Sequence, residues 1–431
     1  MKIKYILLTM LALVFSLSGC TISSEISDES FSALSMDDLV VGIRPFREES
    51  SCLDYGILCG SDSKLKVLDY ESGESIILCG DTNCRHNDEE CPAWFDPYVT
   101  MVGAAIYYGK VYYFLDDMTA IRLYSQSPAG NQQKVIWQES RDDVSVGAYS
   151  LSGIGSVIYH GGYVWIELQY TALLDEAGED VVDTSVVVGI NLETGKAHEL
   201  TQLPELDEET EERLFSEISY VGEGSIITDT VRYSLETNGI RQESYVLHDI
   251  ETLSSRIIHE SEQVRLFEKT GEIGGYLSEL EFLGKYGDRY VCTIYTDENA
   301  NQRGNNRNLY FYNDKDDTFQ ALLEGVSGFP FYEARYKISC LFDGSKILYG
   351  IFGENQETSE IYCLNLETMT SEWAFQDTRN LQYRLYDQVG DQFVFKMYYE
   401  GLFGDGYKAY IISKEDYLHG NFDAKQEIKL R

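Results

Sequence analysis

The stretch from Lys337 to Phe375 decides the fold, because it contains one complete repeating unit. It reads KISCLF at 337–342, KILYGIF at 346–352, EIYCLNL at 360–366 and SEWAF at 371–375. The runs are rich in aromatic and β-branched residues, which is typical of strands. Asp343-Gly344-Ser345 and Glu367-Thr368 are typical of tight turns between antiparallel strands. The stretch therefore predicts four consecutive antiparallel strands.

Similar units recur along the chain past residue 40. Hairpins with short turns rich in acids, Gly or Thr repeat at 71–73, 128–130, 193–195, 251–252, 314–317 and 367–368. Four strands every ~50–65 residues is the pattern of propeller blades. We expect an all-β protein, a β-propeller of seven blades, although six or eight blades fit the same spacing. Stacked β-sandwiches are the alternative architecture.

Composition excludes several classes of protein. The chain has 431 residues, 34 of them basic and 72 acidic, for a formal net charge of −38. Binding to a phosphate backbone needs a basic footprint, and no cluster of Lys and Arg occurs here, so we expect no nucleic-acid partner. With 43% hydrophobic residues, the chain is not disordered.

The first twenty residues contain the parts of an export signal in the expected order. Lys2 and Lys4 precede an apolar run at 6–15 that is too short to span a bilayer, and Leu17-Ser18-Gly19-Cys20 follows. This tetrapeptide resembles the lipobox of bacterial lipoproteins. The resemblance implies that residues 1–19 are a signal peptide and that Cys20 carries diacylglycerol and a fatty acyl chain such as palmitate. An ordinary secretory signal with a chance Cys is the alternative.

This segment sets the expected domain organisation and location. Residues 20–38 are the lipidated Cys and a flexible tether, rich in Ser, Thr and acids. Residues 39–431 are a single propeller domain. We expect the protein at the bacterial cell membrane, with Cys20 as its lipid anchor on the extracytoplasmic face.

A Cys-rich loop at 79–93 carries the most specific motif. Cys79, Cys84, His86 and Cys91 fall within thirteen residues. Three thiolates and one imidazole form a known tetrahedral zinc set, so a structural zinc ion is one interpretation. Disulfides are the rival, because an exported chain meets an oxidising environment: Cys84 with Cys91, and Cys79 with Cys52 or Cys59. Free thiols are the third alternative. Zinc or disulfides would make the loop a structural cross-link rather than an active site. A zinc ion bound by four protein ligands has no open position for a substrate.

Other motifs are weaker. Residues 297–304 resemble the start of a calcium loop but lack its Gly and its final Glu, so a solvated hairpin loop is the better interpretation. The acid pairs Asp116-Asp117 and Asp142-Asp143 suit a glycosidase, although most acids in such a chain are solvated. Catalytic signatures of hydrolases, kinases and dinucleotide enzymes do not occur in the sequence. We therefore assign no catalytic residue. Cys292, Cys340 and Cys363 lie in strand patterns and are expected to be small core residues.

The Cys-rich loop also carries a family resemblance. Leu78-Cys79, Cys84, His86, Cys91 and Ala93, together with the lipobox, are similar to a group of lipoproteins from Gram-positive anaerobes with a TolB-like or DPP-IV-N-like propeller. The resemblance implies a surface propeller of unassigned role and brings no catalytic residues.

From these features we expect a membrane-anchored, non-enzymatic binding or scaffold propeller whose ligand is an unknown protein or glycan. The alternative is a carbohydrate-active hydrolase or lyase with carboxylates at the mouth of the central channel. A subunit of a membrane complex is a third interpretation.

Overall fold

The computed structural model describes a defined part of the chain. The described residues are 40–42, 51–53, 56–59, 64–69, 75–96, 99–142, 145–174, 181–204, 206, 212–234, 241–261, 265–269, 272–277, 280–295, 307–330, 339–352, 358–377, 383–399 and 406–428. The predicted signal peptide, Cys20 and the predicted tether at 20–38 lie outside this part, as does the loop at 297–304. Among the described residues, no helix has both the length and the apolar character that crossing a bilayer requires.

Nearly all regular structure in the described residues is β-structure. The first strands are β1 Val40–Gly42, β2 Ser51–Leu53, β3 Gly56–Cys59, β4 Lys66–Asp69, β5 Ser75–Ile77, β6 Thr100–Tyr107, β7 Lys110–Asp116, β8 Ala120–Gln126, β9 Lys134–Ser140, β10 Tyr149–His160, β11 Tyr163–Leu173, β12 Val181–Asn191 and β13 Ala197–Glu199. The next are β14 Glu212–Gly222, β15 Ser225–Ser234, β16 Arg241–Asp249, β17 Ser255–Ser261, β18 Arg265–Lys269, β19 Glu272–Leu277, β20 Leu280–Tyr286, β21 Arg289–Tyr295, β22 Arg307–Asn313 and β23 Thr318–Val326. The last elements are β24 Lys346–Phe352, β25 Ser359–Asn365, β26 Thr370–Asp377, β27 Tyr383–Val389, β28 Gln392–Tyr399, β29 Gly406–Ser413, the short helix α3 Lys414–Leu418, the 3-10 turn η3 Phe422–Ala424 and β30 Gln426–Ile428.

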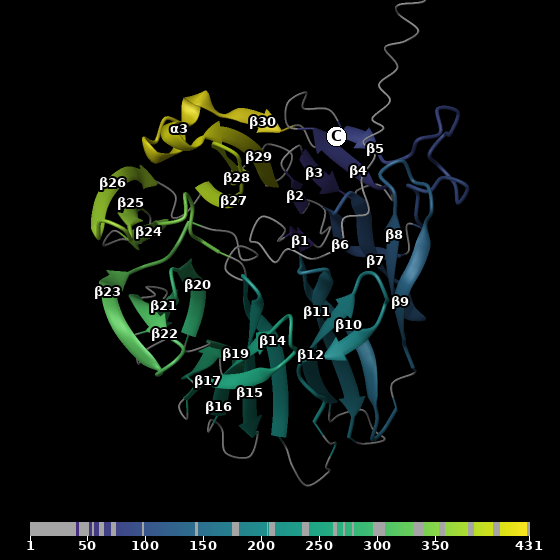
Figure 1. Cartoon of the computed structure of the whole chain (residues 1–431), viewed down its shortest axis with the longest axis horizontal. Helices are drawn as coiled ribbons and strands as arrows, with labels where there is room; N and C mark the ends of the chain where they lie inside the picture. The colour runs from purple at the N-terminus through teal and green to yellow at the C-terminus, as the bar shows by residue number, and fades with distance from the viewer. Residues whose placement is uncertain are drawn as a thin grey trace, which may run out of the picture. The chain divides into compact units, whose positions relative to one another are not determined.

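The strands form repeated antiparallel sheets. β2–β5, β6–β9, β20–β23 and β27–β30 are four-stranded sheets whose strands follow chain order, and β24–β26 is a three-stranded one. The first strands of neighbouring sheets contact each other in the order β6, β10, β14, β20 (Figure 1). These features confirm the predicted β-propeller. The number of blades stays a prediction, because β10–β13 and β14–β17 share one sheet through the parallel pair Ser185 and Phe215.

The run at 337–342 departs from the predicted unit. Of its described residues, only Phe342 bridges Lys346, and the N–H of Cys340 donates to the carbonyl of Leu283 in the preceding sheet at 2.6 Å. The predicted first strand therefore contributes contacts to β20 rather than a regular ladder to β24. The neighbouring sheet supplies the acceptor for the Cys340 N–H that a partner in β24 would otherwise have to provide.

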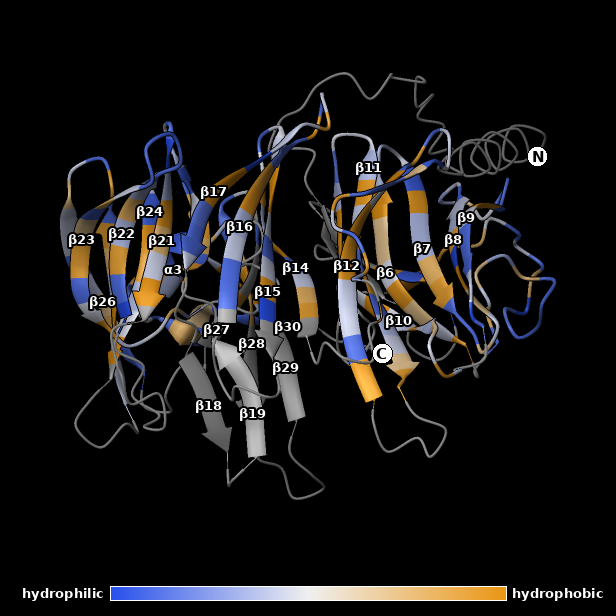
Figure 2. Cartoon of the chain, turned by 90° about the horizontal axis from the view of Figure 1, so that it is seen from below, coloured by the Kyte–Doolittle hydropathy of each residue, from blue (hydrophilic) through white to orange (hydrophobic). Residues whose placement is uncertain are grey.

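Aromatic pairs across adjacent strands fill the sheets. Tyr113 and Tyr124 stack with ring centroids 5.4 Å apart, as do Tyr349 with Tyr362 and Phe395 with Tyr410. In each pair the two residues are direct cross-strand partners. The hydropathy colouring shows apolar bands along strands such as β21, β22 and β7 (Figure 2). These Tyr and Phe side chains thus serve packing within the sheets.

Buried hydroxyl groups tie neighbouring sheets together. Tyr159 of β10 donates to the carbonyl of Gly103 in β6 at 2.7 Å. In the same way Tyr245 donates to Leu280 at 3.1 Å, and Tyr312 donates to the carbonyl of Ile258 at 2.6 Å. Each bond satisfies a polar atom that packing between two sheets would otherwise leave unpaired.

The hairpin turns explain the recurring Glu-Thr pairs. Asn191, Asp249 and Asn365 end their strands, and each accepts the N–H of the Thr three residues later. The residue after each Thr has a positive φ: Gly195 at 72°, Leu253 at 55° and Met369 at 55°. A side-chain acceptor followed by a left-handed residue reverses the chain, as the sequence predicts for these turns.

Candidate functional site

The Cys-rich loop folds through two Asx turns. Asp81 accepts the N–H of Asn83 at 2.8 Å on its side chain and the N–H of Cys84 at 3.2 Å on its carbonyl. Asp88 likewise accepts the N–H of Cys91 at 3.1 Å on its carbonyl. His86 lies between the two turns with a φ of 56°. These turns fold both ends of the loop inward.

The loop brings together all four residues that the sequence selects. The Sγ atoms of Cys79, Cys84 and Cys91 and a ring nitrogen of His86 lie within 4.8 Å of one another. His86 Nδ1 is 3.3 Å from Cys91 Sγ, and the backbone N–H of His86 donates to Cys84 Sγ at 3.4 Å. All three Cys are free thiols, so the predicted Cys84–Cys91 disulfide is not formed in this structure. The side chains of Cys52 and Cys59 lie outside the described part.

The donor set fits a tetrahedral metal ion. Bonds of about 2.3 Å to sulfur imply tetrahedron edges of roughly 3.8 Å, which a cluster of this size contains. Cys91 is buried, whereas Cys79, Cys84 and His86 are half-buried. Burial is the main cause that raises the pKa of the Cys91 thiol to about 12; a backbone hydrogen bond at Ala93 opposes it, and hydrogen bonds with Cys84 and Cys79 add to it. A thiolate at this place therefore needs a positive partner.

The remaining residues from the sequence do not converge on one site. His248 bonds to Thr228 and Ser255 at 2.8 Å each, and His259 bonds to Asp317 at 2.8 Å. Cys292 and Cys340 are buried as predicted, and Cys363 is half-buried.

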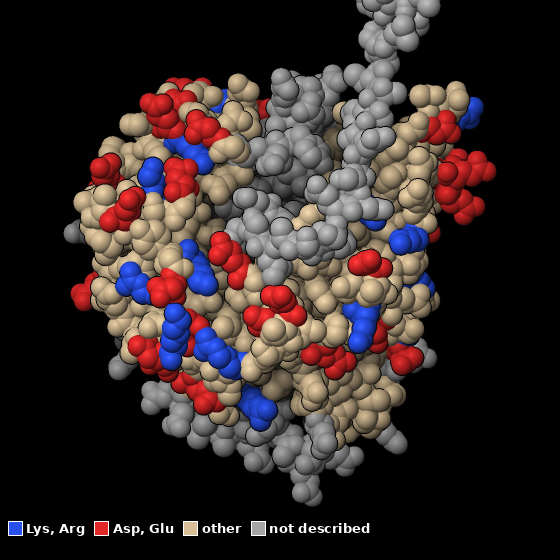
Figure 3. All heavy atoms as spheres, in the orientation of Figure 1, with Lys and Arg blue, Asp and Glu red and all other residues tan. Residues whose placement is uncertain are grey.

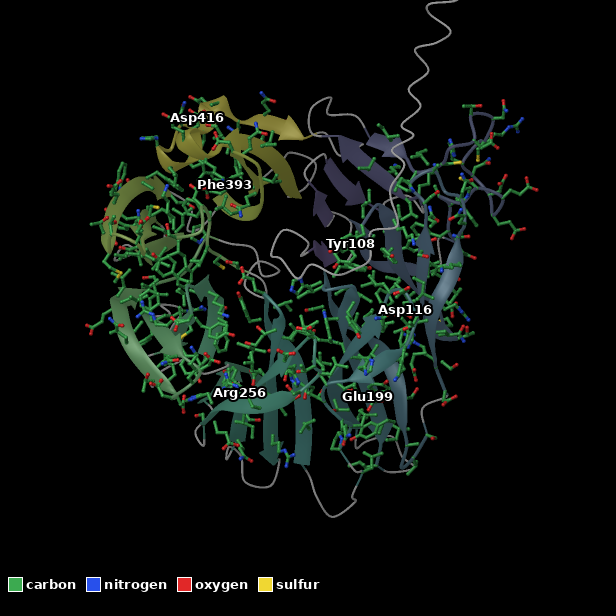
Figure 4. All side chains as sticks on the ribbon, in the orientation of Figure 1. Tyr108, Asp116, Glu199, Arg256, Phe393 and Asp416 are labelled. Atoms are coloured by element: carbon green, nitrogen blue, oxygen red, sulfur yellow. The ribbon has the colours of Figure 1, made fainter. Side chains whose placement is uncertain are left out.

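The predicted acid pairs mainly hold strands together. Asp116 forms an ion pair with Arg141 at 2.7 Å, and Asp117 pairs with Arg122 (Figure 4 marks Asp116). Burial by itself raises the pKa of Asp117. Hydrogen bonds from Thr119, Ala120 and the Arg122 guanidinium outweigh that effect and lower the pKa to about 2. The low pKa leaves Asp117 without a proton to donate at neutral pH.

A different pair of acids lies in a pocket between two sheets. The pocket has a volume of about 340 Å³. Trp137 and Glu139 alternate along β9 and supply one wall, and Glu199 at the end of β13 supplies another (Figure 4). Tyr170 lines it from β11. Leu168 pairs with Val186, and Val188 pairs with Glu199, which places one continuous face of β11–β13 in the floor.

Electrostatics distinguish the two acids. Burial raises the pKa of Glu139 above its usual value, and the charges of Glu199 and Asp142 raise it further. The pKa of Tyr170 is raised by burial first and then by the charges of Glu139 and Glu199. Within the described residues, neither glutamate has a side-chain hydrogen bond or ion pair. Glu139 is half-buried and Glu199 is exposed.

Sequence reasoning did not select Glu139, Glu199, Trp137 or Tyr170. The alternation Trp137-x-Glu139 was a local signal, but it only indicates one face of a strand. Glu139 lies on β9, the last strand of its sheet, and Glu199 lies on β13, which pairs with β12 to one side of the main strand order, whereas the carbohydrate-active alternative placed its carboxylates at the channel mouth.

No model of a known protein family matches the chain, and no curated protein matches it. Three of the solved structures that resemble it are described below. An oligogalacturonate lyase from Vibrio parahaemolyticus is 12% identical, with a TM-score of 0.43 over 89% of this chain and 93% of that one. Porphyromonas gingivalis dipeptidyl peptidase 4 is 8% identical, with a TM-score of 0.40 over 93% and 60%. TolB from Acinetobacter baumannii is 12% identical, with a TM-score of 0.28 over 77% and 62%.

Two of these proteins are a TolB and a dipeptidyl peptidase 4, the propeller types that the expected resemblance named. They also correct the expected function. The sequence favoured a non-enzymatic binding or scaffold propeller, and that prediction was wrong, because the matched structures include a lyase and a peptidase. The physical reason for the error is that a propeller builds its sites from side chains of separate sheets, which leave no motif in the sequence.

Proposed function

We propose that this chain is a carbohydrate-active enzyme, a glycoside hydrolase whose two acids are Glu139 and Glu199. One observation carries the proposal: a half-buried Glu139 with a raised pKa lies in a pocket with a second, exposed carboxylate that affects its titration. Glycoside hydrolysis uses two carboxyl groups in different protonation states, and different environments create that difference.

The environments assign a role to each acid. Glu139 keeps its proton to a higher pH, so it donates that proton to the glycosidic oxygen as the bond to the anomeric carbon breaks. Glu199 is the exposed carboxylate and either directs a water molecule to the anomeric carbon or attacks that carbon itself. When Glu199 directs the water, Glu199 takes the water's proton and Glu139 regains its own proton from solvent; when Glu199 attacks, Glu139 takes the proton of the water that hydrolyses the glycosyl-enzyme.

The walls of the pocket suit a sugar ring. Trp137 and Tyr170 offer aromatic faces for the C–H groups of a sugar, and Gln202 at the pocket's edge offers both a donor and an acceptor. Leu168, Val186 and Val188 are buried and make the floor apolar. A few polar groups above an apolar floor are typical of small-molecule sites.

The test is an activity screen of the full chain on neutral and acidic polysaccharides. New reducing ends indicate glycan cleavage, and ultraviolet absorbance of an unsaturated sugar identifies a lyase. We expect Glu139→Gln and Glu199→Gln each to lower the rate at least a hundredfold. Glu372→Gln on β26 is the matched control, because Glu372 is exposed on another sheet. No cleavage of any glycan, or full activity in both pocket variants, would overturn the proposal.

We also propose that Cys79, Cys84, His86 and Cys91 bind one structural zinc ion. The support is a donor set within 4.8 Å that contains three free thiols and one imidazole. Zinc bound by four protein ligands stabilises a loop and performs no chemistry on a substrate. Metal analysis of protein purified without added zinc should find one ion per chain, and His86→Ala should lower that content.

A control separates zinc from disulfides. Zinc predicts three free thiols at Cys79, Cys84 and Cys91 after denaturation with a chelator, whereas disulfides predict fewer and an unchanged stability in His86→Ala. Absence of metal from the purified protein would refute the zinc proposal.

For the location, we propose that Cys20 anchors the enzyme to the extracytoplasmic face of a bacterial membrane. The ordered export signal and Leu17-Ser18-Gly19-Cys20 support this. Cys20→Ser should release the protein from membranes or halt its processing, and unchanged membrane retention with normal processing would contradict the anchor.

A further inference from the structure

A second groove adjoins the pocket of Glu139 and Glu199. Its volume is about 450 Å³, and it lies on the sheet face of β14–β17. Arg232 is the direct cross-strand partner of Gln242, and Thr230 is the partner of Ser244. These four side chains therefore stand together on one face of β15 and β16.

Arg232 is exposed on the face of β15 that lines this groove. Within the described residues, it makes no hydrogen bond or ion pair. The acid in the same groove, Glu260, is the partner of Ser244 on β17, two strands from Arg232, or roughly 10 Å. A guanidinium stays charged at every physiological pH and matches a carboxylate with two parallel bonds. The groove thus presents a positive group ready for an anion.

The surroundings select the kind of anion. Thr230, Gln242 and Ser244 supply hydroxyl and amide groups that suit sugar hydroxyls. Ile257 is 57% exposed in the same groove and offers apolar surface to a ring face. Such a mixture fits a carboxylated sugar better than a bare inorganic anion.

Gln202 joins the groove to the pocket. This residue lines both cavities, so the two are adjacent and a long ligand can extend from one cavity into the other. The chain as a whole has a net charge of −38, and Figure 3 shows acidic and basic side chains interspersed on the visible face. General attraction of anions is therefore excluded, and preference for an acidic ligand has to come from a local contact.

We propose that Arg232 is a specificity-determining residue that binds the carboxylate of a uronic-acid unit, so that the substrate is an acidic oligosaccharide. This rests on the proposed function: the bond to be cleaved lies between Glu139 and Glu199, and the uronic-acid unit occupies the groove beyond Gln202. Arg232 positions the substrate and takes no part in proton transfer.

The experiment measures binding, so that it does not depend on turnover. Glu139→Gln in the full chain serves as the background, and isothermal titration calorimetry uses trisaccharides of galacturonic, glucuronic, mannuronic and guluronic acid, each as the free acid and as the methyl ester. We expect at least one free acid to bind roughly tenfold more tightly than its ester. Arg232→Gln should remove this difference, and Arg232→Lys should restore part of it.

Lys315→Gln is the matched control, because it removes one positive charge from an exposed side chain on the β22–β23 turn. It should leave the preference unchanged. Equal binding of acid and ester, no binding of any trisaccharide, or an unchanged preference in Arg232→Gln would overturn the inference. If Glu139→Gln and Glu199→Gln keep full activity while Arg232→Gln loses the preference, the proposed catalytic pair fails and the anionic subsite stands.

Discussion

Glu167→Gln tests how neighbouring sheets are held together. The Glu167 carboxylate accepts the N–H of Ser156 on one oxygen and the N–H of Ile218 on the other, both at 2.9 Å. Ser156 belongs to β10 of the same sheet segment, and Ile218 belongs to β14, the first strand of the next. Glu167 is only 7% exposed, so water does not replace a lost bond easily.

The expected cost follows from these two bonds. A hydrogen bond to a charged group contributes about 1.5–3 kcal/mol, and an unsatisfied buried donor costs about 1–3 kcal/mol. Glutamine keeps the size of the side chain and one accepting oxygen. Its NH₂ group, however, faces the second backbone N–H, and because both groups are donors, that N–H loses its acceptor. We therefore expect a loss of about 2–3 kcal/mol in the free energy of unfolding.

The assay is urea denaturation combined with amide hydrogen exchange. Glu193→Gln is the control, because Glu193 is exposed in a turn, and it should change stability by less than about 0.5 kcal/mol. In Glu167→Gln, the amides of Ser156 and Ile218 should exchange faster than those of distant strands. Stability within about 0.5 kcal/mol of the parent, with both amides still protected, would refute the reasoning.

Three further predictions concern other parts of the fold. Burial lowers the pKa of His248 to about 4, so below about pH 6.5 the unfolded chain takes up a proton at this residue and the folded chain does not. The free energy of unfolding should therefore fall by about 2 kcal/mol between pH 7 and pH 5, measured by urea titration at each pH. His248→Gln should reduce this loss. Gly189→Ala should destabilise by about 1–3 kcal/mol or more in the same assay, because its Cβ would lie 2.1 Å from Cζ3 of the buried Trp165; an unchanged midpoint would contradict this packing. Met369→Gly should raise the melting temperature, because Met369 has a φ of 55° at an exposed turn that glycine adopts without strain; a lower melting temperature would argue against that geometry.

The sequence alone determined the strand pattern apart from the run at 337–342, together with the hairpin turns and the residues of the Cys-His cluster. Strand patterns depend on residues two apart, and hairpin turns depend on an Asx side chain and a left-handed residue a few positions later. Cys79, Cys84, His86 and Cys91 come together through turns at Asp81 and Asp88 inside one short loop. Such local features need no knowledge of the neighbouring sheets.

Tertiary structure alone decided the candidate active pocket and the groove beside it. Glu139 and Glu199 lie on strands of different sheets, and they meet because β9 lies alongside the face of β11–β13. The raised pKa of Glu139 arises from that burial and from a charge far away in the sequence. Arg232 likewise gains its proposed role only beside Gln202, which follows β13 in the chain and lines the same groove. Alternation along a strand indicates which face a side chain occupies, but the packing of one sheet on the next decides what that face meets.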